Sequence, residues 1–418
     1  MIWHWLGLCL SGGRARDSAA KHEYDEFAAE RDTSVHAIDE AVDVDYEVGP
    51  VLGRGGFGLV KTGVHRKTQL KCALKFVQRK NLSKKNEELV LMEAGILSGL
   101  AHGHVVEMRG FYKWDKAYCL ALECMDGGEL CEDIIRRVFY SEACARRIIM
   151  QVLDALTFLH RRGICHRDVK PENLLLHRRG GEQIKARCSG NLCFSEGNPW
   201  NRLADFGLAT VLSWPTYKVV EPVGSPGYAA PELLRVLPYD GQVDVFSLGV
   251  VSFVLLSGYL PFGGAANNVA EVVQDTLACK PSFDDVQWSA VSEGARSFVK
   301  SLLNPNPSER PTAESATFHP WMKVHAKALL SRSLSDRRNG DPKPLLQEFQ
   351  TVQRKRLRAA VGAVVAANRL QKFLATGRKD RLDESAISHG EQLPKENGVA
   401  TVLPQGEAGT LPQGEEKI

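Results

Sequence analysis

The stretch His166-Arg167-Asp168-Val169-Lys170-Pro171-Glu172-Asn173 guides the interpretation of this 418-residue chain. Asp168 offers a carboxylate that can accept a hydroxyl proton, and Lys170 supplies a cation two positions later. Asn173 follows with a side-chain amide that can hold a metal ion. This spacing is what a loop that catalyses phosphoryl transfer requires. A motif of this length rarely arises by chance, so a catalytic role outweighs a purely structural one.

A glycine-rich segment lies upstream, at Gly53-Arg54-Gly55-Gly56-Phe57-Gly58-Leu59-Val60. The G-x-G-x-x-G pattern alone also fits dinucleotide folds, but here a second strand-like segment follows it instead of a helix. Glycines allow such a hairpin to bring its backbone amides close to phosphate groups. Cys72-Ala73-Leu74-Lys75 falls on the next strand pattern, and Glu93 lies in a segment with helical apolar spacing.

Together these motifs resemble those of eukaryotic-type protein kinases. The resemblance implies an α+β, bilobal fold with a small antiparallel β-sheet N-lobe, a larger α-helical C-lobe and a C-terminal regulatory helix. It covers residues 46–322 and includes Asp205-Phe206-Gly207, Ala230-Pro231-Glu232 and Asp244–Val250. Lys170 is typical of the serine/threonine kinases rather than of the tyrosine kinases.

The resemblance also implies roles for individual residues. Asp168 would orient the substrate hydroxyl and accept its proton, and Lys170 would stabilise charge on the transferred phosphate. Asn173 and Asp205 would bind Mg²⁺. The residues expected to hold ATP are Leu52, Gly53, Gly55, Gly58, Val60, Ala73, Lys75, Glu93, Glu123, Met125 and Glu129.

Within the ATP set, Lys75 would hold the α- and β-phosphates, and Glu93 is preferred over Glu87 and Glu88 as its orienting partner. The backbone of Glu123–Met125 would contact adenine. Glu129 falls where family members contact the ribose and a basic substrate side chain. It is also explained as a glutamate at a helix N-terminus, stabilised by the helix dipole.

Five further polar residues have expected structural roles. Asp244 would hold the backbone of the catalytic loop, and Arg310 would pair with Glu232. Glu221 stands three residues before Gly224, where many kinases carry a phosphorylatable residue. Its carboxylate could pair with Arg167 and order the activation segment without phosphorylation, or could be a solvated loop side chain.

The spacing between Asn173 and Asp205 departs from the family, which needs about half of these 32 positions. Removing Ala186–Arg202 would leave Ile184-Lys185-Leu203-Ala204-Asp205, a regular strand that enters the D-F-G motif. We therefore interpret residues 186–202 as an insertion that bulges out as a loop, and as a retained intron or gene-model error by hypothesis. A genuine insertion would displace Asp205 or force the hairpin into a new register.

The region after residue 322 resembles a regulatory tail. Residues 323–344 read as a linker and 345–379 as an autoinhibitory and calmodulin-binding segment. Arg354–Lys379 lacks Asp and Glu and carries eight Lys or Arg, with apolar residues along one helical stripe. This pattern fits a helix that enters a calmodulin groove, and also a membrane-surface helix or one that docks on the kinase. It resembles the regulatory segment of type IV and related calcium/calmodulin-dependent kinases.

The remaining segments and the composition exclude several classes of protein. Residues 1–45 read as a flexible leader and 380–418 as a disordered tail. The net charge of +3 gives no reason to expect nucleic acid as a partner, and no apolar run is long enough for a membrane span. The ten cysteines favour reduced thiols, and the single pair Cys188 and Cys193 does not make a zinc site.

The sequence therefore predicts a calcium/calmodulin-regulated protein serine/threonine kinase that uses ATP and Mg²⁺. Its expected partners are calcium-loaded calmodulin, bound through Arg354–Lys379, and protein substrates with basic residues near Ser or Thr. The expected location is the cytoplasm, with the nucleus as an alternative. A second reading is a catalytically impaired pseudokinase, disabled by the insertion, that serves as a calmodulin-binding scaffold.

Overall fold

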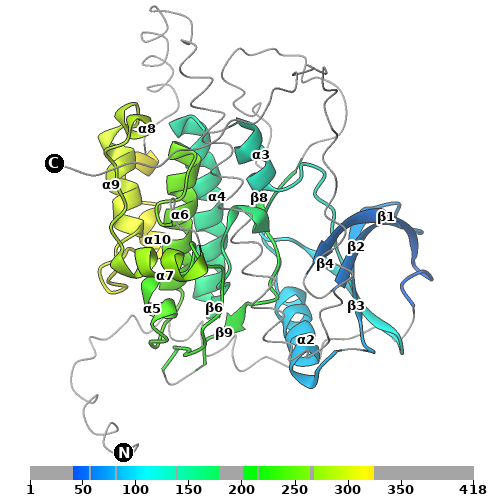
Figure 1. The fold of residues 1–418 in the computed structure, drawn as a ribbon. Helices are drawn as coiled ribbons and strands as arrows, with labels where there is room; N and C mark the ends of the chain where they lie inside the picture. The colour runs from blue at the N-terminus through cyan, green and yellow to red at the C-terminus, as the bar shows by residue number, and fades with distance from the viewer. Residues whose placement is uncertain are drawn as a thin grey trace, which may run out of the picture. The chain divides into compact units, whose positions relative to one another are not determined.

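The computed structural model describes residues 41–55, 58–80, 82–137, 140–177, 201–213, 216–263 and 268–323. Within these ranges the polypeptide forms the two lobes expected from the sequence (Figure 1). The leader up to residue 40, most of the insertion, and the segments 324–344, 345–379 and 380–418 lie outside the described residues.

The N-lobe is built on one antiparallel sheet with the strand order β1-β2-β3-β5-β4. Its strands are β1 (Tyr46–Gly55), β2 (Gly58–His65), β3 (Lys71–Gln78), β4 (Met108–Lys113) and β5 (Ala117–Glu123). The strand β5 lies between β3 and β4, and its first five residues are buried, which matches its apolar sequence AYCLALE. The helix α2 (Lys84–Ser98) packs beside β4 and begins at Ser83, whose hydroxyl accepts a hydrogen bond from the Asn86 amide.

The C-lobe is helical. Its longer helices are α3 (Leu130–Arg137), α4 (Glu142–Arg161), α6 (Gln242–Ser257), α7 (Val269–Ala278) and α9 (Glu293–Leu302). Shorter elements are α5 (Pro231–Leu234), α8 (Val286–Ser289), α10 (Ala313–Ala316), η1 (Pro171–Asn173) and η2 (Pro320–Lys323). Short strands β6 (Ile164–Cys165) and β9 (Thr210–Val211) form one pair, and β7 (Leu174–Leu176) and β8 (Asn201–Leu203) form another.

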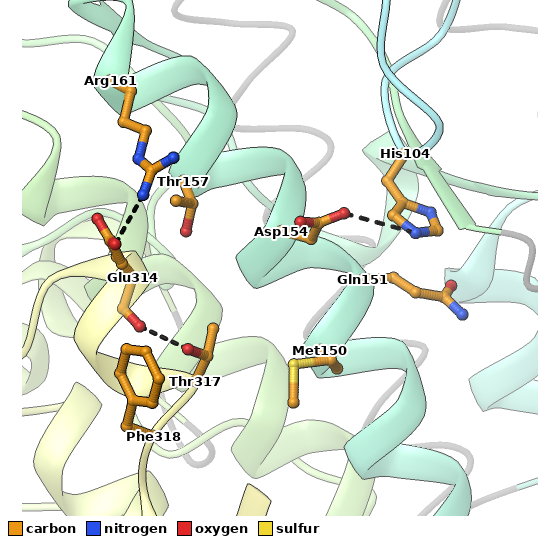
Figure 2. Close-up of a pocket in the computed structure, with 9 residues that line it drawn as sticks. All are labelled: His104, Met150, Gln151, Asp154, Thr157, Arg161, Glu314, Thr317 and Phe318. Carbon is orange, nitrogen blue, oxygen red and sulfur yellow. Dashed lines mark hydrogen bonds and ion pairs between the residues drawn. The ribbon is translucent and has the colours of Figure 1, made fainter.

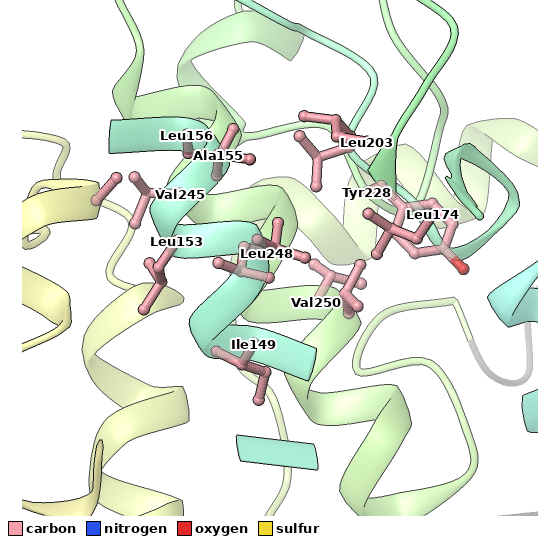
Figure 3. Close-up of a cluster of buried hydrophobic side chains, with 14 of the residues drawn as sticks. Ile149, Leu153, Ala155, Leu156, Leu174, Leu203, Tyr228, Val245, Leu248 and Val250 are labelled. Atoms are coloured by element: carbon pink, nitrogen blue, oxygen red, sulfur yellow. The ribbon is translucent and has the colours of Figure 1, made fainter. Parts of the chain in front are cut away.

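Two long helices form the centre of the C-lobe. All but the first residue of α6 are buried, which fits its largely apolar sequence, and it ends at Gly258 in the left-handed conformation. Figure 3 shows the inward side chains of α4, among them Leu153 and Leu156, packed against Leu248 of α6 and near Leu203 of β8. This packing fixes β7 and β8, which lie next to Asn173 and Asp205 in the chain, to the close-packed centre of the lobe.

Two residues that the sequence analysis placed in the flexible leader contact the N-lobe. Val42 is 2% exposed and packs in the cluster of Tyr46, Cys72 and Leu74. Asp45 accepts hydrogen bonds from the Tyr112 hydroxyl and, at its backbone oxygen, from the Arg66 amide. The end of the predicted flexible leader therefore packs on the N-lobe, which the polar composition around a single valine did not indicate.

The predicted insertion is also too long at its C-terminal end. Asn201 and Arg202 form β8, which pairs with β7 in the register Leu176↔Asn201, Leu175↔Arg202 and Leu174↔Leu203. The Asn201 amide donates to Gln151 Oε1, 3.1 Å away, and Asn201 is buried. Contacts with distant residues therefore make this segment a strand, although its local sequence gives no strand pattern.

Candidate active site

Asp168 is the centre of a hydrogen-bonded cluster in the catalytic loop. The Lys170 ammonium lies 2.7 Å from Asp168 Oδ2, and the Asn173 side-chain amide donates to the backbone and side-chain oxygens of Asp168. The Ser225 hydroxyl donates to Asp168 Oδ1 at 2.5 Å and accepts from Lys170 at 2.8 Å. All four residues are buried. The cluster fixes a carboxylate, a cation and a metal-binding amide in one place.

The sequence analysis did not assign a role to Ser225 in this cluster. It lies 57 positions from Asp168, and only its place near the end of the activation segment marked it. The structure shows that its hydroxyl bridges the carboxylate of Asp168 and the ammonium of Lys170. Ser225 therefore ties the position of the activation segment to that of Asp168, the expected catalytic base.

The backbone of the catalytic loop is held by Asp244 of α6, as expected from the sequence. Asp244 accepts hydrogen bonds from the amides of His166 and Arg167 at 2.9 and 2.7 Å, and from His160 at 2.8 Å. Burial opposes the charge of Asp244, but the hydrogen bond and charge of His160 outweigh it and lower the pKa of this carboxyl. Arg167 adopts a φ of 66°, a conformation that such fixed contacts can sustain.

Lys75 of β3 lies between two carboxylates. Its ammonium is 2.7 and 2.9 Å from the two oxygens of Glu93 in α2 and 3.4 Å from Asp205 Oδ1. Burial opposes the charge of Lys75, but Glu93 and Asp205 outweigh it and raise its pKa, so the ammonium stays charged at neutral pH. The rival Glu87 instead accepts a hydrogen bond from the Tyr118 hydroxyl. Glu93 is thus the residue that fixes Lys75.

Asp205 is held beside the catalytic loop despite the long connection that precedes it. The Ala204 amide donates to the Asn173 carbonyl at 2.9 Å. The two expected metal ligands, Asn173 and Asp205, therefore lie on adjoining backbone segments. Phe206 is 1% exposed, and its ring packs edge-to-face on His166 with the centroids 4.8 Å apart. The additional residues have therefore not displaced the D-F-G motif.

The other expected nucleotide residues lie on one side of the N-lobe and along the connection between the lobes. Leu52, Gly53 and Gly55 are in β1, and Gly58 and Val60 are in β2, where Gly53 pairs with Val60 and Gly55 with Gly58. Ala73 pairs with Leu122 across β3 and β5. Glu123 ends β5, Met125 follows it, and Glu129 directly precedes α3.

These residues fit a nucleotide and a divalent cation. A Cβ on Gly58 would lie 1.7 Å from the Phe76 carbonyl, so only glycine lets β2 pass this close to β3. A Cβ on Gly53 would meet nothing within 4 Å, so the backbone there is open to a ligand. Lys75 can neutralise phosphate charge, and the oxygens of Asn173 and Asp205 are the hard ligands that Mg²⁺ prefers.

An acidic rim, Glu129 and Glu172, borders the catalytic cluster. Both carboxylate oxygens of Glu172 are buried and have no hydrogen-bond partner among the described residues. Burial raises the pKa of Glu172, and burial with the charges of Glu132 and Glu172 raises the pKa of Glu129 to about 7. Glu129 as a whole residue is exposed, so solvent limits this shift. A cationic group of a ligand would relieve the cost of both carboxylates.

The activation segment is tied to the catalytic loop by an ion pair. The Arg167 guanidinium lies 2.8 Å from Glu221 Oε2 and also donates to the Leu208 carbonyl and the Tyr239 hydroxyl. The Tyr239 hydroxyl donates in turn to the Glu221 carbonyl at 2.8 Å. The Arg167–Glu221 pair considered in the sequence analysis is thus present, and its role in ordering the segment without phosphorylation stays a prediction.

Replacing Glu221 by Ala should lower the kcat of protein produced in a host without protein kinases by roughly tenfold, because a charge-assisted hydrogen bond to buried Arg167 is lost. The measurement is the steady-state rate of peptide phosphorylation at saturating ATP. Lys218→Ala, an exposed change in the same segment, is the control and should act like the wild type. Equal rates for Glu221→Ala and the control would remove this role from Glu221.

A pocket of about 360 Å³ lies elsewhere, between α4 and the end of α10 (Figure 2). Its lining includes His104, Asp154, Arg161, Glu314 and Phe318. None of the residues expected to bind ATP or metal is among the lining residues, so this pocket is separate from the catalytic cluster.

The described residues show few other candidate sites. The seven described cysteines are all free thiols, and the described part of the chain contains no group of three or more His, Cys, Asp or Glu suited to a metal ion. Cys188 and Cys193 lie outside the described ranges. Among the helices that the structure describes, none combines the length and apolar character needed to cross a membrane.

Comparison with known proteins agrees with this site. The protein kinase domain family matches residues 46–322. A probable myosin light chain kinase of Dictyostelium discoideum is 34% identical over 284 residues, which are 68% of each chain. Calcium/calmodulin-dependent protein kinase type IV of Rattus norvegicus is 32% identical over 84% of this chain and 68% of its own. The kinase cmkA of Emericella nidulans is 33% identical over 78% and 71%.

The matched range contains every residue of the catalytic cluster, together with the Lys75–Glu93 pair and Asp205. A match of this extent shows the family, and the family implies ATP and a divalent metal as cofactors. The family match and these relatives together show that the chain belongs to the protein kinase family and is a protein serine/threonine kinase.

Proposed function

We propose that this kinase transfers the γ-phosphate of ATP, with Mg²⁺, to Ser or Thr residues near basic side chains, under the control of calcium-loaded calmodulin. The assembled cluster of Asp168, Lys170 and Asn173, with Asp205 beside it, is the observation that carries the catalytic part. The described residues give no support to the pseudokinase alternative. A location in the cytoplasm or nucleus remains part of the proposal.

The chemistry follows from the positions of the side chains. Asp168 orients the substrate hydroxyl and takes its proton. Lys170, held by Asp168 and Ser225, stabilises charge on the phosphoryl group during its transfer. Glu93 keeps Lys75 extended toward the phosphates. Asn173 and Asp205 would hold Mg²⁺, which would neutralise charge on the β- and γ-phosphates.

The preference for basic substrates rests on Glu129 and Glu172. Both carboxyls have raised pKa values, and Glu172 keeps two buried oxygens without a hydrogen-bond partner in the described structure. A substrate guanidinium would supply the missing donors and favour the charged carboxylates. Neutral or acidic peptides would leave these buried carboxylates without a cationic partner, so the free-energy cost of burying their charge would remain.

Regulation by calmodulin is supported by the sequence of Arg354–Lys379 and by relatives named as calcium/calmodulin-dependent kinases. The proposed mechanism is a population shift: the segment 345–379 occupies the substrate cleft at rest, and calmodulin binds its basic apolar helix more tightly than the cleft does.

The test is phosphorylation of a serine peptide with arginines, compared with the same peptide carrying glutamines, in calcium/calmodulin and in chelator. We expect at least tenfold stimulation by calcium/calmodulin and a clear preference for the arginine peptide. Protein that ends after residue 344 should be active in chelator. A truncated protein no more active in chelator than the full chain would refute autoinhibition, and an inactive stimulated enzyme would refute the catalytic proposal.

A further inference from the structure

Arg202 of β8 connects three separate parts of the molecule. Its Nε forms an ion pair with Glu123 Oε2 at the end of β5, with the two atoms 2.9 Å apart, although this oxygen has no well-oriented hydrogen bond among the described residues. One of its terminal nitrogens donates to the backbone carbonyls of His102 and Val105, 3.2 and 3.0 Å away. The side chains of Arg202 and Glu123 are 26% and 13% exposed, so water screens this pair only in part. Lysine, with a single nitrogen, could not reproduce the forked contact.

The strand on which Arg202 stands is fixed on both sides. The Asn201 amide donates to Gln151 of α4, and the Asn201 carbonyl lies 3.3 Å from His104 Nδ1. Figure 2 shows His104 near Gln151 of α4, with its ring directed at Asp154 of the same helix. Leu203 exchanges backbone hydrogen bonds with His104 and Val106. These contacts with α4 and with the loop after α2 fix the register of β8.

The two ends of the Arg202–Glu123 pair have different functions. Glu123 lies in the segment expected to contact adenine through its backbone, next to Leu122 and Met125. Arg202 lies three residues before Asp205, the expected metal ligand. The loop that contains His102 and Val105 directly follows α2, which carries Glu93. The Arg202 guanidinium thus connects Glu123, at the expected adenine end of the site, to two other parts of the molecule. One is the loop after α2, the helix whose Glu93 positions Lys75, and the other is β8, which leads to the expected metal ligand Asp205.

We infer that Arg202 is a positioning residue for nucleotide binding, which acts by holding Glu123 and β8 in their relative places. The inference rests on the proposed function, because the role of the Glu123 segment in adenine binding comes from it. The contacts of Arg202 carry it: a purely structural arginine could bond the two carbonyls alone, whereas this one also fixes the side chain at the adenine end. Loss of Arg202 should weaken nucleotide binding more than peptide binding.

The experiment compares full-length Arg202→Met, Arg202→Lys and Arg161→Met with the wild type. Arg161 is the matched control because it also forms an ion pair, with Glu314. This pair connects α4 to α10, away from the catalytic cluster. The readouts are the KM values for ATP and peptide, kcat, and the Kd of ADP measured by calorimetry. We expect Arg202→Met to raise the KM of ATP and the Kd of ADP at least fivefold, with the peptide KM within twofold. Arg202→Lys should fall in between.

A double-mutant cycle separates positioning from stability. If the pair acts as a unit, Arg202→Met in a Glu123→Gln background should change the Kd of ADP by less than twofold. Wild-type ADP affinity in folded Arg202→Met, or an equal loss in Arg161→Met, would overturn the inference. An inactive wild type that still binds ADP would refute the proposed function. The ADP affinities of the variants would still test the role of Arg202 in that case.

Discussion

Replacement of Asp168 by Asn should reduce kcat for peptide phosphorylation by about 10²–10⁴-fold, the usual contribution of a positioned general base. The amide has the size of the carboxylate, and its single oxygen can still accept the hydrogen bond from Lys170. Its NH2 group cannot accept the hydrogen bond that Ser225 donates to the second oxygen of Asp168, and the amide cannot take a proton. The fold should persist because the loop backbone is held by Asp244 and not by Asp168.

The measurement is kcat at saturating ATP and peptide, together with the KM of ATP. The KM of ATP should stay within threefold of the wild type, since Lys75 and Glu93 remain in place. Asp115→Asn, an exposed change in the turn between β4 and β5, is the control. A kcat for Asp168→Asn within tenfold of the control would contradict the assignment of Asp168 as the base.

Replacement of Arg310 by Met should destabilise the domain by about 3–5 kcal/mol, the usual cost of leaving one partner of a buried ion pair alone. Arg310 has a fully buried side chain and contacts both oxygens of Glu232 at 2.7 and 3.1 Å. It also donates to the carbonyls of Gln242 and Asn304. The change would thus leave a carboxylate and two carbonyls without this donor.

Thermal unfolding followed by circular dichroism checks this expectation, with a predicted fall in Tm of about 10 °C for a domain of this size. Arg161→Met removes an exposed ion pair and should lower Tm very little. The double variant Arg310→Met with Glu232→Leu should lose less than the sum of its parts, because no unpaired charge is left. A single Arg310→Met variant as stable as Arg161→Met would show that the pair contributes nothing.

The sequence could predict most of the candidate site because its motifs are local and each residue type is tied to one chemical task. Asp168, Lys170 and Asn173 lie within six residues, and Lys75 and Glu93 lie on neighbouring elements. The choice of Glu93 over Glu87 and Glu88 followed from helical spacing, which sets the face on which each side chain lies. The Arg310–Glu232 and Asp244 contacts were predictable from the resemblance alone.

The predictions that failed concern segments whose local sequence does not decide their structure. Val42 was assigned to the leader because one apolar residue in a polar stretch carries no periodicity. Asn201 and Arg202 were assigned to the insertion because Ile184-Lys185 offered a more regular strand. Autoinhibition and calmodulin binding by residues 345–379 remain predictions, since these residues lie outside the described ranges.

The sequence by itself determined that this chain is a kinase, since the residues that perform phosphoryl transfer stand at fixed spacings in H-R-D-V-K-P-E-N and D-F-G. Only the tertiary structure decided how Asp205 stays beside Asn173 across 32 positions. Gln151, His104 and Glu123 hold Asn201 and Arg202 in register, and these partners come from α4, the loop after α2 and β5. Strand register depends on side-chain contacts between distant segments, which local sequence patterns do not encode.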